Sequence, residues 1–147
     1  MLKIKRLNLD TSWQIEWNGT SLLLDPWLVG SEVDYFAAFN KQWHKTPPAK
    51  IEQLDPYDAI LISQHFSDHC HEETLKLLKK ENLFCTPKAL LRIKKTFPDL
   101  EIQPFPSFSE NKWLKFRNLE ISWLPAPKKL SASFSGIIIR NENDCIV

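Results

Sequence analysis

Three histidines and one aspartate lie within seven residues of the chain, as His65, Asp68, His69 and His71. Neutral imidazole nitrogens and carboxylate oxygens are ligand types that zinc and iron accept. A catalytic zinc needs three protein ligands and keeps a fourth position open for water. Asp68, His69 and either His65 or His71 could supply three, so zinc or another divalent metal is one prediction. The absence of any cofactor is an equally supported alternative.

The cluster follows a continuous apolar run, Ala59–Ile62. Such a run is typical of a strand buried on both faces of a layered α/β sheet. Sites in these folds collect at the carboxyl ends of strands. A helix is predicted over residues 71–81, with acidic residues in its first turn and lysines toward its end. In a metal-free fold, Asp68 would cap this helix and His69 would hydrogen-bond internally.

The other elements follow from periodicity and turn residues. Asn18-Gly19 predicts a tight hairpin turn. We expect a bulge at Lys5-Arg6, a long loop over residues 31–56 with a short helix near Val33–Asn40, and a second helix capped by Thr86. The predicted strands cover Leu2–Leu9, Trp13–Trp17, Ser21–Leu24, Asn82–Cys85, Trp113–Phe116, Leu119–Trp123 and Phe134–Arg140, and the second helix covers Pro87–Lys95 with Leu90, Leu91 and Ile93 buried.

The C-terminus predicts an unfinished hairpin. Asn141–Asp144 has the composition of a turn, and Cys145–Val147 begins a return strand. A fold that opens a strand and stops three residues into it indicates that the sequence is the N-terminal portion of a longer domain. Residues 1–147 are therefore expected to form part of one domain.

Composition narrows the classes of partner. The formal net charge is +1, so nothing indicates a nucleic-acid or anionic-membrane surface, and no apolar run is long enough to span a bilayer. The three glycines are too far apart for a phosphate-binding loop. The three cysteines are widely spaced, which favours a reducing cytoplasm over a disulfide scaffold. Cys70, between two histidines near a helix start, could have a lowered pKa and act as a nucleophile.

Two further segments carry a family resemblance. The order Leu24-Asp25-Pro26-Trp27-Leu28, then Ile60–Ser63, then Asp68-His69 and a helix resembles the metallo-β-lactamase superfamily, especially its lactonase-like and plant or cyanobacterial branches. The resemblance covers roughly residues 1–140, mostly as element order. It implies an α/β fold with layered β-sheets and flanking helices, here an incomplete αββα sandwich.

The family's metal loop reads His-x-His-x-Asp-His. Aligning its last two residues with Asp68-His69 puts Gln64 and Phe66 at the positions of the first two histidines. The next family histidine would fall in Pro125–Lys129, which contains none. The resemblance therefore implies a degenerate site that keeps only Asp68 and His69, which belong to the family's second metal position.

Two functions remain open. One is a metal-dependent hydrolase of a small ester, lactone or phosphoester, in which Asp68 takes part in catalysis and Asp25, Gln64 and Phe66 line the pocket. The other is a non-catalytic binding or interaction protein that retains the fold. A sheet edge left open by an incomplete sandwich would also favour self-association.

Overall fold

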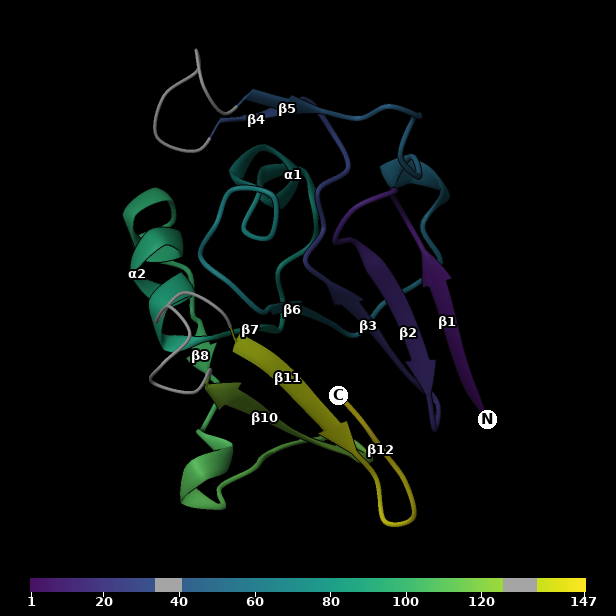
Figure 1. The fold of residues 1–147 in the computed structure, drawn as a ribbon, viewed down its shortest axis with the longest axis vertical. Helices are drawn as coiled ribbons and strands as arrows, with labels where there is room; N and C mark the ends of the chain where they lie inside the picture. Colours follow the sequence, from purple (N-terminus) through teal and green to yellow (C-terminus); the bar gives the residue numbers. More distant parts are fainter. Residues whose placement is uncertain (34–40, 126–134) are drawn as a thin grey trace.

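The computed structural model describes residues 1–33, 41–125 and 135–147 (Figure 1). A six-stranded sheet has the spatial order β1-β2-β3-β6-β7-β8, and a four-stranded antiparallel sheet has the order β12-β11-β10-β9. Strands β4 and β5 form a separate antiparallel pair. The first sheet contains β1 (Leu2–Arg6), β2 (Trp13–Trp17), β3 (Thr20–Leu24), β6 (Ala59–Ile62), β7 (Leu83–Cys85) and β8 (Gln103–Pro104).

The remaining elements are shorter or lie in the second sheet. They are β4 (Ser31–Val33), β5 (Lys41–Trp43), β9 (Leu114–Phe116), β10 (Leu119–Pro125), β11 (Ser135–Arg140), β12 (Cys145–Ile146), helices α1 (Glu72–Leu77) and α2 (Pro87–Thr96), and the short 3₁₀ turns η1 (Ile51–Gln53) and η2 (Phe108–Glu110). None of the described helices is long and apolar enough to cross a membrane.

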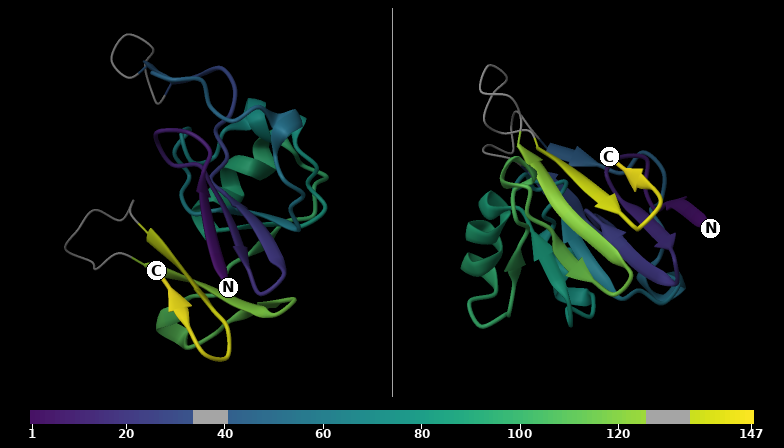
Figure 2. Two further views of the ribbon diagram at one scale, coloured as in Figure 1. Left: turned by 90° about the vertical axis from the view of Figure 1, so that its right-hand side faces the viewer. Right: turned by 90° about the horizontal axis from the view of Figure 1, so that it is seen from below.

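The fold has three layers, namely the helices, the six-stranded sheet and the four-stranded sheet, and two clusters of buried apolar side chains lie between them. One lies between the first sheet and the helices and includes Ile60, Leu75 and Ile93. The other joins the two sheets and includes Leu61 and Ile121. Figure 2 shows the four-stranded sheet packed on the face of the first sheet that the helices do not cover. This confirms the predicted layered α/β fold, because β6 supplies alternate side chains to both clusters.

The Asn18-Gly19 hairpin is confirmed. Asn18 has φ 50° and Gly19 has φ 74°, which are the left-handed values that a tight two-residue turn between twisted strands requires. The turn sets β2 against β3 in register, with Trp17 opposite Thr20. Strand β3 then pairs in parallel with β6, which brings Leu24 beside Leu61. The carboxyl ends of β3 and β6 are consequently neighbours.

Strand β1 differs from the prediction, and the helix predicted in the long loop falls mostly outside the described residues. No bulge interrupts β1, which pairs with β2 in unbroken register from Leu2 to Arg6, so that prediction was wrong. The alternation slips because the strand ends at Arg6, and Leu7 is then buried in a turn closed by its N–H and the carbonyl of Ser12. The helix predicted near Val33–Asn40 lies outside the described residues, apart from Val33, which ends β4.

The helices begin as predicted but differ in length and in buried face. Helix α1 stops at Leu77 instead of residue 81, because the Tyr57 hydroxyl accepts from the Lys79 N–H and donates to its carbonyl. Those two groups are therefore unavailable for another helical turn.

In α2, Ile93 is buried as expected, whereas Leu91 is 77% exposed. The prediction that Leu91 belongs to the core was wrong, since it lies on the outer face of the helix.

Helix α2 offers a matched test of the core. Ile93→Ala should lower the free energy of unfolding by about 2–5 kcal/mol, because it leaves a cavity in the cluster beneath the sheet. Leu91→Ala on the same helix should change it by less than about 0.5 kcal/mol. Urea denaturation of both variants measures the difference. Equal losses would contradict the assignment of the buried face.

Candidate functional site

The candidate site begins where β3 and β6 end side by side. Asp25 follows β3, and its N–H donates to the carbonyl of Leu61 at 2.9 Å, which continues the pairing of the two strands. Ser63 follows β6, and its N–H donates to Asp25 Oδ1 at 2.7 Å. The Ser63 hydroxyl donates to the other oxygen of the same carboxylate. Asp25 is only 3% exposed, so these bonds replace water around a buried charge.

His69 completes this network from the loop after β6. Its Nδ1 lies 2.7 Å from Asp25 Oδ2 and 3.2 Å from the Ser63 hydroxyl. A carboxylate only accepts hydrogen bonds, so Nδ1 carries the proton in the neutral ring, and Nε2 gains one only when the ring becomes charged. Nε2 lies 3.7 Å from Asp68 Oδ2. The network therefore orients the free nitrogen of His69 toward Asp68.

Electrostatics favour the protonated form of His69. Burial lowers the pKa of His69, but the hydrogen bond to Asp25 and the negative charges of Asp25, Asp68 and Asp10 together outweigh it. The net pKa lies above its ordinary value. The backbone of the loop is also held, because the Thr11 hydroxyl donates to the carbonyl of Asp68 at 2.7 Å.

Gln64 and Phe66 occupy the two positions where the family places histidines. Among the described residues, neither side chain forms a metal site with Asp68 and His69. The Gln64 side-chain oxygen is buried and has no hydrogen-bond partner. The ring of Phe66 packs against the ring of His65 at a centroid distance of 4.4 Å. The His65 carbonyl accepts from Arg92, which ties the loop to α2.

His71 takes a separate role at the start of α1. It is the N-cap residue, and its Nδ1 accepts from the Thr74 N–H at 3.2 Å and lies 2.7 Å from the Thr74 hydroxyl. Nε2 then carries the proton and donates to Glu32 at 2.5 Å. Burial lowers the pKa of His71 to about 4, so the ring is neutral. The alternative prediction that Asp68 caps this helix was wrong, because His71 does so.

Cys70 does not have the chemistry of an activated nucleophile. It is fully buried, and burial raises its pKa to about 12. The expectation of a lowered pKa was wrong because the neighbouring histidines in sequence do not offset desolvation. All three cysteines are free thiols, and Cys85 is buried like Cys70.

Sequence reasoning missed the polar residues that support the site. Ser12 accepts from the Trp27 N–H at 2.8 Å and donates to the Asp25 carbonyl at 2.8 Å. Asn8 donates to Ser12 and to the Trp27 carbonyl. Only the position of Ser63, directly after a buried strand, could have been recognised in advance. The others are isolated polar residues whose partners become visible only in the fold.

The described residues do not fit a catalytic zinc centre. Two ligands about 2.0–2.1 Å from a tetrahedral zinc lie roughly 3.4 Å apart, which is near the separation of Asp68 and His69. A third donor is missing, since within residues 1–33, 41–125 and 135–147 no group of three or more His, Cys, Asp or Glu side chains is arranged to hold a metal. The stretch in which the next family histidine was sought, beyond Pro125, lies outside the described residues.

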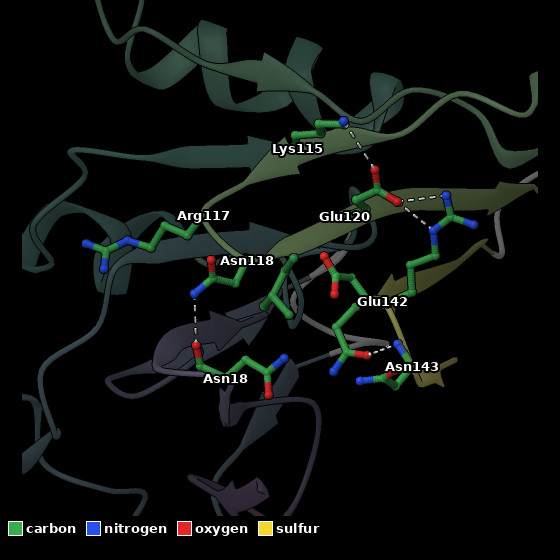
Figure 3. Close-up of a pocket in the computed structure, with 10 residues that line it drawn as sticks. Asn18, Lys115, Arg117, Asn118, Glu120, Glu142 and Asn143 are labelled. Carbon is green, nitrogen blue, oxygen red and sulfur yellow. Dashed lines mark hydrogen bonds and ion pairs between the residues drawn. The ribbon is translucent and has the colours of Figure 1, made fainter.

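A larger cleft lies at the opposite end of β3 (Figure 3). It has a volume of about 700 Å³ and is formed where three hairpin turns converge, at Asn18, at Arg117-Asn118 and at Asn141–Asn143. Its Arg140 pairs with Glu120 at 2.7 Å, and Arg117 pairs with Asp58 at 2.9 Å. Because both guanidinium groups are paired with carboxylates, neither arginine of this cleft is left without a counter-ion to bind an anionic ligand.

Comparison with known proteins agrees with the fold. Residues 9–141 match the family described as the beta-lactamase superfamily domain, which is most of the chain. The chain therefore belongs to this superfamily. No curated protein sequence matches it.

Solved structures with this fold include several metal-dependent enzymes. A metallo hydrolase from the hyperthermophilic archaeon Ignicoccus hospitalis is 16% identical, with a TM-score of 0.64, and the match covers 99% of this chain and 58% of that protein. A possible metal-dependent hydrolase from Veillonella parvula is 12% identical, with a TM-score of 0.70 and coverage of 97% and 60%. An isothiocyanate hydrolase from Delia radicum gut bacteria is 16% identical, with a TM-score of 0.69 and coverage of 97% and 59%.

The chain spans about 60% of the length of these structures. At such low identity the likeness concerns the fold alone. The lactonase-like and plant or cyanobacterial branches remain predictions from sequence.

The coupling between Asp25 and His69 can be tested by titration. Asp25→Asn should lower the pKa of His69, because it removes both the charge and the charged hydrogen-bond acceptor. Asp10→Asn removes a weaker contribution and should produce a smaller decrease. NMR titration of the histidine ring protons measures both. An unchanged pKa in Asp25→Asn would show that the two groups do not interact.

The Asp25–His69 pair also predicts how the free energy of unfolding changes with pH. Because the folded pKa of His69 is raised, its protonation stabilises the fold below about pH 6.5, and this contribution disappears as pH rises through the folded pKa.

His71 predicts the opposite dependence on pH. Its folded pKa is about 4, so the unfolded chain takes up a proton first as pH falls below about 6.5. Stability should therefore fall as pH decreases from about 6.5 toward about 4. His71→Asn keeps a good N-cap residue and removes the titrating ring, so its unfolding free energy should depend less on pH across this range. Denaturation at several pH values gives both slopes, and equal slopes would rule out this role for His71.

Proposed function

We propose that this chain is a metal-dependent hydrolase relative with a degraded metal site, and that the residues present do not hold a catalytic metal by themselves. The observation that carries the proposal is that Gln64 and Phe66 occupy the two loop positions where the family has histidines, while His69 and Asp68 remain close, with Nε2 3.7 Å from Oδ2. A zinc site with only two protein ligands is not expected to bind tightly.

Phe66 adds a second physical argument. Its apolar ring offers no donor to a metal, and it packs against the ring of His65 at a centroid distance of 4.4 Å. The Asp25–Ser63–His69 network supports the proposal as well, because it satisfies the buried carboxylate without a metal. The fold can therefore be stable although the ligand set is incomplete.

The substrate class of an active relative would be an ester, lactone or phosphoester. Solved relatives described as metallo or metal-dependent hydrolases support a hydrolytic ancestry. For this chain, activity would require further ligands that the described residues do not provide. A binding function on the retained fold is the second candidate, favoured by a pocket of about 350 Å³ beside Trp27 that needs no metal.

Location and self-association are also proposals. The cytoplasm is favoured by the three free thiols of Cys70, Cys85 and Cys145, because a chain without disulfides is typical of a reducing compartment. Strand β1 lies at an edge of the first sheet with Ile4 55% exposed, so pairing of two copies at such an edge is a proposal for the oligomeric state. Light scattering at high protein concentration tests it, and a monomer throughout would exclude it.

Metal content tests the central proposal. The chain, purified without an affinity tag and then incubated with zinc, iron or manganese and desalted, should retain less than about a tenth of an equivalent of each. Elemental analysis measures this directly. Retention of one full equivalent of any of these metals would overturn the proposal.

Restoring the missing donors tests the alignment of the loop. Gln64→His combined with Phe66→His should raise zinc retention severalfold above that of the parent chain, because it adds two imidazole donors to the loop that carries Asp68 and His69. Gln64→Asn combined with Phe66→Leu is the matched control and should gain nothing. Gln64→His alone, with one added donor and the aromatic ring kept, should show a smaller gain if the double variant does not fold. No gain in any folded variant would show that positions 64 and 66 do not face His69.

A further inference from the structure

A small pocket lies beside Trp27, on the side of the fold that carries the Asp68–His69 pair. It has a volume of about 350 Å³, which falls within the usual range of small-molecule sites. The loop after β1 forms one side, and the end of β5 with the residues after it forms the other. The lining residues are Leu9, Asp10, Trp27, Gln42, Trp43, His44, Lys45 and Thr46.

The apolar part of the pocket is unusually accessible. Trp43 is 67% exposed and Leu9 is 58% exposed, although both are large apolar side chains. His44 packs on Trp27 with ring centroids 4.2 Å apart, which adds a second flat surface. Exposed apolar residues that gather around a pocket indicate a binding site more often than isolated ones do. A planar ring could stack on Trp43 and remove its face from water.

Two opposite charges line the same pocket. Asp10 supplies a carboxylate, and Lys45 supplies an ammonium group. In the part of the chain that the structure describes, neither side chain takes part in an ion pair within 4.0 Å, so the two do not neutralise each other by direct contact. A ligand with one positive and one negative group would complement both.

One buried side chain holds the backbone on one side of the pocket. Asn8 Oδ1 accepts from the Asp10 N–H at 2.9 Å, and Asn8 Nδ2 donates to the Trp27 carbonyl at 2.9 Å. Asn8 is itself 6% exposed and bonded to Ser12, which supports the backbone of Asp25. The main chain at Asp10 and Trp27 is therefore fixed before a ligand binds, which lowers the entropic cost of binding on this side.

We propose that this pocket binds a small zwitterion with a planar aromatic group, as in a free aromatic amino acid. The amine of the ligand meets Asp10, its carboxylate meets Lys45, and its ring stacks on Trp43. Thr11, the residue after Asp10, donates its hydroxyl to the Asp68 carbonyl at 2.7 Å, so the bound amine lies on the same side of the fold as the candidate site. The proposal does not depend on a metal or on hydrolysis.

The experiment uses three matched probes and the untagged chain labelled with ¹⁵N. L-tryptophan carries both charges, tryptamine only the amine, and indole-3-propionate only the carboxylate. Titrations followed by two-dimensional NMR should show saturable shifts at residues 9–10 and 42–46, including the indole N–H of Trp43. L-tryptophan should bind at least about tenfold more tightly than either analogue, equivalent to about 1.4 kcal/mol.

Three variants assign the groups. Trp43→Ala should abolish the saturable shifts with all probes, and the variant should remain folded because Trp43 is 67% exposed. Asp10→Asn should weaken L-tryptophan and tryptamine but leave indole-3-propionate unchanged. Lys45→Gln should weaken L-tryptophan and indole-3-propionate but leave tryptamine unchanged. Leu91→Ala, at another exposed apolar position, is the control and should bind like the parent chain.

Each other outcome contradicts the proposal. Equal affinity for the three probes would mean that the exposed ring of Trp43 binds any indole without using Asp10 or Lys45. Shifts centred outside residues 9–10 and 42–46 would place the site elsewhere. The absence of saturable shifts at millimolar probe would exclude the pocket as a site for this class of ligand.

Discussion

The buried carboxylate of Asp25 joins the end of β3 to the end of β6 and the loop after it, which lie 38 and 44 residues further along the chain at Ser63 and His69. It accepts from the backbone N–H and hydroxyl of Ser63 and from the ring of His69. A carboxylate this deeply buried would be strongly destabilising without such partners. The ends of β3 and β6 and the following loop are therefore fixed relative to one another. Asp25 also has φ 45°, a left-handed conformation that costs energy for a residue with a side chain, and the surrounding bonds hold it there.

This interaction also fixes the orientation of His69. The network turns Nε2 of His69 toward Asp68, whose Oδ2 lies 3.7 Å away. The bonds to Asp25 come from Ser63 and His69, so neither Gln64 nor Phe66 supplies them. The hydrogen bond of His71 to Glu32 adds a second connection, because it attaches β4 to the start of α1. The contacts that hold this loop are therefore independent of the residues at positions 64 and 66.

Much of the fold was predictable because its signals are local. The Asn18-Gly19 turn, the apolar run of β6 and the order Asp25, Asp68-His69 each identify an element or the family from neighbouring residues. The roles of His71 and Glu32 were not predictable, because the two are distant in sequence and meet only after β4 docks. Leu91 shows the same limit, since periodicity could not tell which side of a short helix meets the sheet. The pocket beside Trp27 likewise combines Asp10 and Lys45 through tertiary structure.

The protonation pattern of His69 tests this account most directly. Long-range ¹H–¹⁵N NMR of the histidine rings distinguishes which nitrogen carries the proton in the neutral form. Above the pKa of His69, the structure predicts a proton on Nδ1, bonded to Asp25, and an unprotonated Nε2 facing Asp68. In Asp25→Asn this preference should weaken. A neutral His69 with its proton on Nε2 in the parent chain would contradict the Asp25 interaction on which the site depends.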